Sequence, residues 1–206
     1  GKTLSSFLPS LIDLAHTPRT GLHTLYLSPI KALAVDIARN LETPISEMNL
    51  PISVETRTGD TPQAKRKRQR STPPNMLMTT PESLELMLSW PDAEKLFGSL
   101  KLIIIDEIHT LSGTKRGDLL SLSLSALRHL ATKSQSIGLS ATVSTPERFR
   151  PWLSAQPDEV CILQPVQNKT IVLSILETEA ERLTWSGHSG LYAAKEIYKL
   201  IVEHRP

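Results

Sequence analysis

Cysteine is almost absent from the sequence, where Cys161 is the only one among 206 residues. A single thiol can form neither an internal disulfide framework nor a cysteine-based zinc site, and we expect Cys161 to be a small buried hydrophobe. The lone thiol and the lack of a signal-peptide pattern favour a cytoplasmic location, with association with the nucleoid if the source is bacterial. No H-x₃-H or H-E-x-x-H zinc spacing occurs among the six histidines, which are His16, His23, His109, His129, His188 and His204.

Long hydrophobic runs and aromatic residues are scarce as well. The apolar run Leu102–Ile105 has only four residues, which excludes a membrane-spanning helix and predicts no membrane partner. Aromatic residues make up 4% of the chain, too few for a broad base-stacking surface, whereas the 39% of hydrophobic residues suffice for a packed core. The chain starts with glycine rather than methionine, so we expect it to be a piece of a longer protein.

The net charge is only +2, from 23 basic and 21 acidic residues, but it is unevenly distributed. Six basic residues and one acid lie between residues 57 and 70, while the other residues carry 17 positive and 20 negative charges. The basic residues of this cluster are Arg57, Lys65, Arg66, Lys67, Arg68 and Arg70. Two interpretations stay open at this point: a phosphate-binding face, or a solvated helix rich in lysine and arginine.

Short β-rich runs alternate with longer helical ones along the chain. Strands are predicted at Thr24–Ser28, Ile52–Thr56, Met76–Thr79, Leu102–Asp106 and Ser136–Ser140. Helices are predicted at Leu4–Ala15, Ile30–Asn40, Pro62–Arg70, Glu82–Leu88, Gly117–Leu130 and Pro146–Trp152. Because several strands are apolar throughout, the alternation predicts an α/β fold with a doubly wound parallel sheet covered on both faces.

The composition changes after Trp152. Further strands are predicted at Val160–Leu163 and Thr170–Leu176, and an amphipathic helix at Leu191–Val202. One face of that helix would carry Leu191, Ala194, Ile197, Tyr198 and Ile201. We therefore expect a first domain over residues 1–165, and a connection with the opening elements of a second domain over residues 166–206.

Three motifs carry chemistry, and the first is the triplet Gly1-Lys2-Thr3 that opens the chain. It is the end of the phosphate-binding loop G-x-x-x-x-G-K-[ST], in which backbone N–H groups at a helix N-terminus surround phosphates. Gly1 and Lys2 would bind the phosphates of ATP, and the Thr3 hydroxyl would bind Mg²⁺.

The second motif, the apolar strand Leu102–Ile105 followed by Asp106 and Glu107, is the strongest. Its carboxylates follow a buried strand, at the sheet edge where α/β folds bind ligands. Asp106 would hold Mg²⁺, Glu107 would act as general base towards water, and His109 would sense the γ-phosphate.

The third motif is Ser140-Ala141-Thr142, which follows another predicted strand. The Ser140 and Thr142 hydroxyls can hydrogen-bond to Asp106 or His109, and this would couple the nucleotide to a second site.

These motifs, in this order, resemble the first motor domain of superfamily 2 helicases of the DExH kind. The segments "SPIKALA" (residues 28–34), "RTGDT" (57–61), "TTPESL" (79–84) and "DEIH" (106–109) are most similar to the large helicase-related (Lhr) group. The later "WSGHSG" (185–190) is similar to the bacterial ligase-associated branch of that group. The resemblance implies a RecA-like fold, ATP and Mg²⁺ as cofactors, and movement 3′ to 5′ on single-stranded DNA in DNA repair.

The same resemblance places nucleic-acid contacts at the ends of three predicted strands. The residues concerned are Ser28, Pro29, Lys31, Arg57, Thr58, Gly59, Thr79, Thr80 and Pro81. Hydroxyl groups and free N–H groups at such positions suit sugar-phosphate contacts that do not read sequence, and lysine or arginine would add charge.

The sequence departs from the helicase pattern in two ways. The first half of the phosphate loop is missing, and so is the second motor domain that would complete the ATP site, so we expect the chain by itself to be inactive. Two alternatives stay open: a helicase directed to RNA, and a non-catalytic nucleic-acid-binding module that retains the fold.

Overall fold

The computed structural model describes residues 2–141, 143–164 and 194–203. It divides into two compact units, residues 1–162 and residues 163–206, which are described separately here. The predicted boundary after residue 165 refers to functional domains and stays a prediction.

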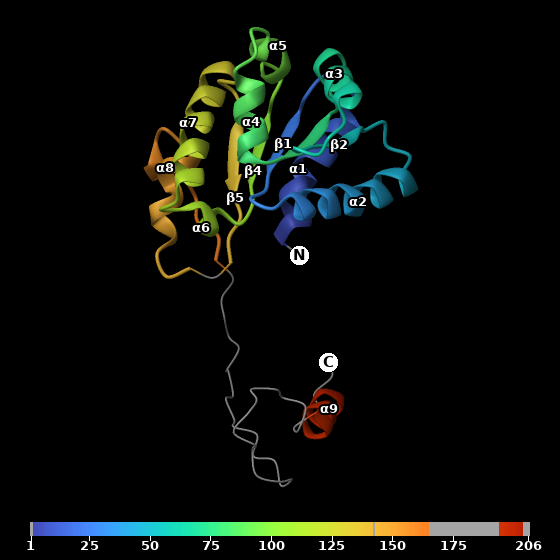
Figure 1. The fold of residues 1–206 in the computed structure, drawn as a ribbon, viewed down its shortest axis with the longest axis vertical. Helices are drawn as coiled ribbons and strands as arrows, with labels where there is room; N and C mark the ends of the chain where they lie inside the picture. Colours follow the sequence, from blue (N-terminus) through green and yellow to red (C-terminus); the bar gives the residue numbers. More distant parts are fainter. Residues whose placement is uncertain (1, 142, 165–193, 204–206) are drawn as a thin grey trace. The chain divides into compact units, whose positions relative to one another are not determined.

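A five-stranded, entirely parallel sheet forms the centre of the first unit, in the order β2-β3-β1-β4-β5 (Figure 1). The strands are β1 (Thr24–Leu27), β2 (Val54–Arg57), β3 (Met76–Thr79), β4 (Leu102–Ile105) and β5 (Gln135–Gly138). Each predicted strand of the first domain lies within two residues of an observed one, except for Val160–Leu163, which forms no strand. The predicted doubly wound parallel sheet is therefore confirmed.

Helices cover both faces of this sheet. They are α1 (Lys2–His16), α2 (Lys31–Glu47), α3 (Gln63–Ser71), α4 (Pro81–Leu88), α5 (Ala93–Phe97), α6 (Ile108–Leu111), α7 (Lys115–Leu130) and α8 (Arg150–Leu153), with 3₁₀ turns η1 (Pro146–Phe149) and η2 (Pro157–Glu159). The alternation of side chains along each strand assigns the helices to faces. Leu25 and Leu27 point into a core shared with α4, α5 and α7, while Tyr26 points into a second core shared with α1 and α2.

Two helix starts near the carboxyl edge are fixed by side-chain caps. The Thr80 hydroxyl accepts a hydrogen bond from Ser83 N at 3.4 Å, and Pro81 occupies the first position of α4. At α7, the Thr114 hydroxyl accepts from Gly117 N at 3.1 Å. Such caps satisfy N–H groups that a helix cannot pair internally, so they fix where the helix begins.

The structure corrects several expectations. α2 continues to Glu47, past the predicted end at Asn40 and through Pro44, because buried Leu41 and Ile45 keep its last turns against the sheet. The short helices α5 and α6 were not predicted, since four or five residues give no readable periodicity. Cys161 is exposed and lies outside any strand, so the prediction that it is buried was wrong.

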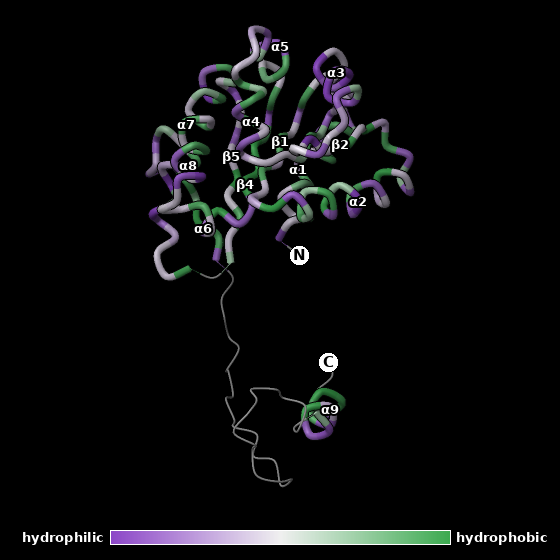
Figure 2. Tube along the Cα trace, viewed as in Figure 1, coloured by the Kyte–Doolittle hydropathy of each residue, from purple (hydrophilic) through white to green (hydrophobic). Residues whose placement is uncertain are grey.

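In the second unit, residues 163 and 164 and the helix α9 (Ala194–Glu203) are described, and α9 lies inside the predicted helix. Its residues Ile197, Tyr198 and Ile201, which share the predicted apolar face, are exposed in this unit. In Figure 2, green and purple stretches of the tube alternate along α9, as expected for an amphipathic helix. The predicted strand Thr170–Leu176 and residue Leu191 lie outside the described residues.

No helix in the described ranges is long and apolar enough to span a bilayer.

Candidate functional site

The candidate residues lie in one row along the carboxyl edge of the sheet. The register pairs Leu27 of β1 with Thr79 of β3 and with Ile105 of β4, so the residues that follow these strands are neighbours. The row consists of Thr58, Thr80, Ser28, Asp106 and Leu139, read in strand order. Because β1 lies in the middle, Asp106 is on one side of it and Thr80 and Thr58 are on the other. The sheet order thus separates two candidate sites that share one edge.

On the β4 side, the amino end of α1 contacts the third motif, which follows β5. Lys2 Nζ donates a hydrogen bond of 2.6 Å to the carbonyl oxygen of Ser140. The lysine of the first motif is therefore adjacent to the second and third motifs, although 138 positions separate it from Ser140. No acidic residue lies in the first turn of α1, which leaves its positive end open to an anion. Gly1 lies outside the described residues.

Asp106 is held by two donors, one of which the sequence did not indicate. Its Oδ1 accepts a 2.8 Å bond from the N–H of Glu107, and its Oδ2 accepts a bond from the phenol of Tyr26. Tyr26 is fully buried on β1, and Asp106 is 6% exposed. Burial, strengthened by the hydrogen bond to Asp106 and by nearby negative charge, raises the pKa of the Tyr26 phenol far above its ordinary value. The phenol therefore remains a proton donor to this carboxylate.

Glu107 has a left-handed backbone conformation, with φ 48° and ψ 39°. This conformation costs a residue with a Cβ roughly 1–2 kcal/mol, and such a cost is typical of functional sites. It turns the chain sharply between β4 and α6 and leaves the Glu107 side chain 37% exposed beside the buried Asp106. Two adjacent carboxylates thus have different environments, one buried and hydrogen-bonded and the other facing solvent.

His109 joins the second motif to the third. Its Nδ1 lies 3.3 Å from Glu107 Oε2 and 3.1 Å from the Ser140 hydroxyl. The expected hydrogen bond between Ser140 and this histidine is therefore present. Ala141 follows on the surface, and Thr142 lies outside the described residues. A continuous polar chain runs from Glu107 through His109 and Ser140 to Lys2.

The chemistry of this site fits a magnesium ion bound together with a nucleotide. Each Asp106 oxygen has one protein donor and retains a lone pair for a metal-bound water. Thr3 is half-buried in the first turn of α1, at the motif position whose hydroxyl binds Mg²⁺. Mg²⁺ with a nucleotide needs only one or two protein ligands besides phosphate and water. Among the described residues no group of three or more potential metal ligands occurs, so nothing there points to a zinc site.

On the β3 side of the row, two grooves run along the candidate nucleic-acid residues. The first encloses about 350 Å³ and is lined by Pro29, Lys31, Gly59, Thr80, Glu82, Ser83, Leu86 and Arg116. The second encloses about 390 Å³ and is lined by Lys31, Ala32, Val35, Thr56, Thr58, Asp60, Thr61, Pro62 and Lys65. Lys31 lines both grooves and pairs with Asp60 at 2.9 Å, an exposed ion pair that a phosphate could displace.

Other predicted contact residues are buried beside the grooves and have local partners. The Ser28 hydroxyl accepts from Ile30 N at 3.2 Å, and the Thr79 hydroxyl donates to the Arg57 carbonyl at 2.7 Å. Pro81 is buried at the start of α4. These groups shape the loops and helix starts rather than line the grooves.

Arg57 does not occupy the position expected of a phosphate-binding side chain. It is 7% exposed, and its guanidinium lies 4.6 Å from the ring centre of Trp90 and donates to the carbonyl of Arg66 at 3.1 Å. Burial, with repulsion from Arg66 and Arg70, lowers the pKa of Arg57. This arginine supports the packing of α3 against β2 instead of facing a groove.

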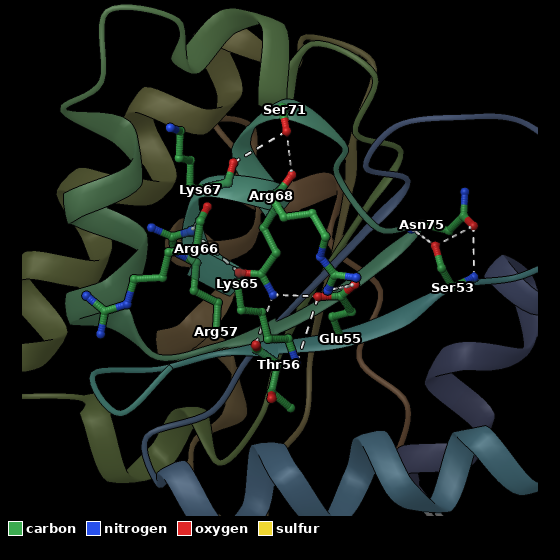
Figure 3. Close-up of polar contacts among 11 residues, drawn as sticks. Ser53, Glu55, Thr56, Arg57, Lys65, Arg66, Lys67, Arg68, Ser71 and Asn75 are labelled. Atoms are coloured by element: carbon green, nitrogen blue, oxygen red, sulfur yellow. Dashed lines mark hydrogen bonds and ion pairs between the residues drawn. The ribbon is translucent and has the colours of Figure 1, made fainter. Parts of the chain in front are cut away.

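Two neighbouring carboxylates pair with the basic cluster around α3, and Figure 3 shows one of them, Glu55. Arg68 pairs with Glu55 at 2.7 Å, and Arg70 pairs with Asp92 at 2.6 Å. Figure 3 shows Arg68 and Lys65 converging on Glu55 of β2, whereas Lys67 extends away from it. These ion pairs favour the solvated-helix interpretation of this cluster, and α3 is purple along much of its length in Figure 2 because its residues are polar.

Sequence reasoning missed two residues of this edge, Tyr26 and Arg116. Tyr26 lies two residues before Ser28 on a strand that reads as uniformly buried, and a polar group in such a strand needs a partner. That requirement was a usable signal. Arg116 gave no comparable signal, because its partners are 34 and 87 positions away in the sequence.

A lysine, two adjacent carboxylates and a histidine meet at the carboxyl edge of the parallel sheet. This arrangement defines the ATP-binding domain of a RecA-like motor. Residues 1–149 match the DEAD/DEAH box helicase family, and the chain belongs to that family.

Comparisons with individual proteins agree with the Lhr group. The chain is 44% identical over 189 residues to "Lhr helicase/ probable uracil glycosylase" of Mycolicibacterium smegmatis, covering 85% of this chain and 12% of that protein. It is 41% identical to "ATP-dependent helicase Lhr-Core" of Methanothermobacter thermautotrophicus, covering 74% of this chain and 19% of that protein. The structure of Mycobacterium smegmatis helicase Lhr bound to ssDNA and AMP-PNP superposes with a TM-score of 0.68 at 46% identity, over 76% of this chain and 21% of that one.

The predicted resemblance to the Lhr group is thus confirmed, while the assignment to the ligase-associated branch stays a prediction. The residues on which that branch rests, 185–190, lie outside the described ranges. The chain spans less than a quarter of the length of each of these three relatives.

Proposed function

We propose that this chain is the first motor domain of an ATP-dependent helicase that moves 3′ to 5′ on single-stranded DNA and acts in DNA repair. Residues 1–165 form that domain in this proposal, and residues 166–206 are the connection and the opening elements of a second motor domain of the same polypeptide. The observation that supports it best is the shared edge. The chain of contacts from Lys2 to Glu107 lies on one side of β1, and the grooves at Lys31 and Thr80 lie on the other.

In this proposal Lys2 binds the β- and γ-phosphates of ATP, and N–H groups at the start of α1 bind the same phosphates. Thr3 and Asp106 would hold Mg²⁺, which would supply positive charge next to the phosphates. Glu107 accepts a proton from a water molecule as the water oxygen bonds to the γ-phosphorus and the bond to ADP breaks. His109 and Ser140 transmit the change that hydrolysis causes at Glu107. His109 contacts both Glu107 and Ser140, and Ser140 belongs to the segment that follows β5.

The proposed DNA contacts use the residues that line the grooves: Pro29, Lys31, Thr58, Gly59 and Thr80. Lys31 is exposed and supplies charge, while loop backbone and hydroxyl groups bind sugar and phosphate without reading bases. Two observations favour DNA. The M. smegmatis structure is bound to ssDNA, and the helicase MrfA, 32% identical with a TM-score of 0.65, was solved bound to DNA.

The test is ATP hydrolysis by the full-length protein without nucleic acid, with single-stranded DNA, and with RNA of the same length and sequence. We expect DNA to stimulate hydrolysis at least tenfold more than RNA does. Equal stimulation by RNA would favour the RNA-directed alternative. Absence of hydrolysis under every condition would favour the non-catalytic module.

Tyr26→Phe tests the role of the buried phenol. We expect about tenfold slower ATP turnover and a higher half-saturating Mg²⁺ concentration, because a hydrogen bond to a charged group is worth about 1.5–3 kcal/mol and here orients Asp106. The fold should survive, since the ring keeps its contact with Phe7 at a centroid distance of 5.4 Å. A Mg²⁺ titration of steady-state ATPase measures both values. Tyr198→Phe, which removes an exposed phenol on α9, is the control. An unchanged Mg²⁺ dependence would mean that Tyr26 acts only in packing.

A further inference from the structure

Arg116 connects three segments that are far apart in the sequence. It is the second residue of α7, and its Nη2 donates to the carbonyl oxygen of Pro29 at 2.9 Å. Its Nε donates to Glu82 Oε1 at 2.6 Å, in the first turn of α4. The loop after β1 and the start of α4 are the walls of the first groove, and Arg116 itself lines that groove. One guanidinium therefore spans a candidate nucleic-acid site from wall to wall.

The backbone that carries Arg116 is in turn fixed to the DEIH segment. α6 begins directly after Glu107, and the Thr114 hydroxyl donates back to the carbonyl of Leu111 at its end at 2.7 Å. Gly117 packs so closely on this turn that a Cβ placed there would lie 2.1 Å from the Leu111 carbonyl oxygen. The two backbones are in close contact there, and only residues 112–114 join the two helices, so we expect a displacement of α6 to move the start of α7 as well.

The Arg116–Glu82 pair is exposed, with 46% and 50% of the two side chains accessible. Ion pairs this exposed contribute little to folding stability, so a functional effect of this pair would have to come from its position at the groove. Partial burial acts to raise the pKa of Glu82, but hydrogen bonds from Arg116, the backbone and Thr80 outweigh it, and the pKa lies below its ordinary value. Glu82 is thus a full negative charge at neutral pH, at a groove proposed to bind phosphate.

We propose that Arg116 is a positioning residue that couples the ATP site to the nucleic-acid groove. A change at Glu107 moves α6, the tight contact at Gly117 carries α7 with it, and the guanidinium shifts both groove walls together. This inference rests on the proposed function and adds a residue to it. Two acceptors at different angles require the planar fork of arginine, so lysine in its place would hold only one wall.

The coupling is measured as the ratio of single-stranded DNA dissociation constants without and with the ATP analogue AMP-PNP, using fluorescence anisotropy on the full-length protein. A coupled system changes this ratio from 1, usually by 5-fold or more, in either direction. We expect Arg116→Ala to bring the ratio to within about 2-fold of 1 and to lower the maximal DNA-stimulated ATPase rate at saturating DNA. Arg116→Lys should give an intermediate ratio, and so should Glu82→Gln, which leaves the contact with Pro29 in place.

The matched control is Arg68→Ala, which removes the exposed arginine of another ion pair, the one between Arg68 of α3 and Glu55 of β2. Its ratio should equal that of the wild type. If Arg116→Ala keeps the wild-type ratio, the coupling proposal is overturned. If it weakens DNA binding equally with and without AMP-PNP, Arg116 is a simple phosphate contact and the proposal is overturned as well. Failure of the proposed function is a different outcome from failure of the coupling proposal: in that case, DNA would not stimulate ATP hydrolysis by the wild-type protein.

Discussion

Replacing Glu107 with glutamine is expected to abolish steady-state ATP turnover by the full-length protein while ATP binding is kept. General base catalysis contributes about 10²- to 10⁴-fold, and the amide of glutamine cannot accept the proton of the attacking water. The amide has nearly the same shape as the carboxylate, and Asp106 keeps both of its donors, Tyr26 and the N–H of residue 107. Single-turnover hydrolysis and the affinity for a fluorescent ATP analogue measure the two effects separately.

Glu94→Gln is the matched control, because this exposed glutamate on α5 belongs to neither candidate site. Its turnover should equal that of the wild type. Normal turnover by Glu107→Gln would refute the assignment of Glu107 as the base. A loss of nucleotide binding in that variant would instead indicate that Glu107 has a structural role in the turn after β4.

Gly117→Ala is expected to cause the largest loss of stability of any small substitution at this edge. The new methyl group would lie 2.1 Å from the Leu111 carbonyl oxygen and 2.8 Å from the ring of Trp152, so backbone has to move. Overpacking costs about 1–3 kcal/mol or more, which exceeds the roughly 1 kcal/mol that alanine gains over glycine in a helix. The upper end of that range less the alanine gain is about 2 kcal/mol, and for a domain of this size each kcal/mol lowers the Tm by about 2–4 °C, so we expect a decrease of roughly 4–8 °C.

Thermal unfolding followed by circular dichroism measures this decrease. Gly59→Ala is the comparison, because its methyl group would meet only the flexible Lys31 side chain, at 3.4 Å. We expect its Tm to stay within about 2 °C of the wild-type value. A Gly117→Ala protein as stable as the wild type would show that α6 and α7 separate easily. The rigid connection from Glu107 to Arg116 would then lose its basis.

Local sequence was enough to predict most of the elements that position the site. Apolar runs marked the strands, and Thr80-Pro81-Glu82 has the residue types that start a helix. Where prediction failed, tertiary packing decided the outcome. Pro44 argued for an early end to α2, but buried Leu41 and Ile45 hold that helix on the sheet to Glu47. Val160–Leu163 has strand-forming residues, but it pairs with no strand among the described residues, so its strand propensity alone does not make it a strand.

The candidate site divides in the same way. The sequence alone was enough to predict that two carboxylates lie at the end of a buried strand, because Asp106 and Glu107 directly follow Leu102–Ile105. The contact between Ser140 and His109 was also expected, since both residues follow parallel strands. The structure buries Arg57 against Trp90, which its position at a strand end did not reveal, and its predicted contact with nucleic acid stays a prediction.

The sequence by itself determined the identity of the chemical groups and the ends of the strands at which they lie, because both depend on residue type and local periodicity. Only the tertiary structure decided which groups meet. The strand order places β1 between the two candidate sites, brings the Tyr26 phenol to Asp106 and brings Arg116 to Pro29 and Glu82. These contacts join residues up to 87 positions apart, and no local pattern encodes such a separation.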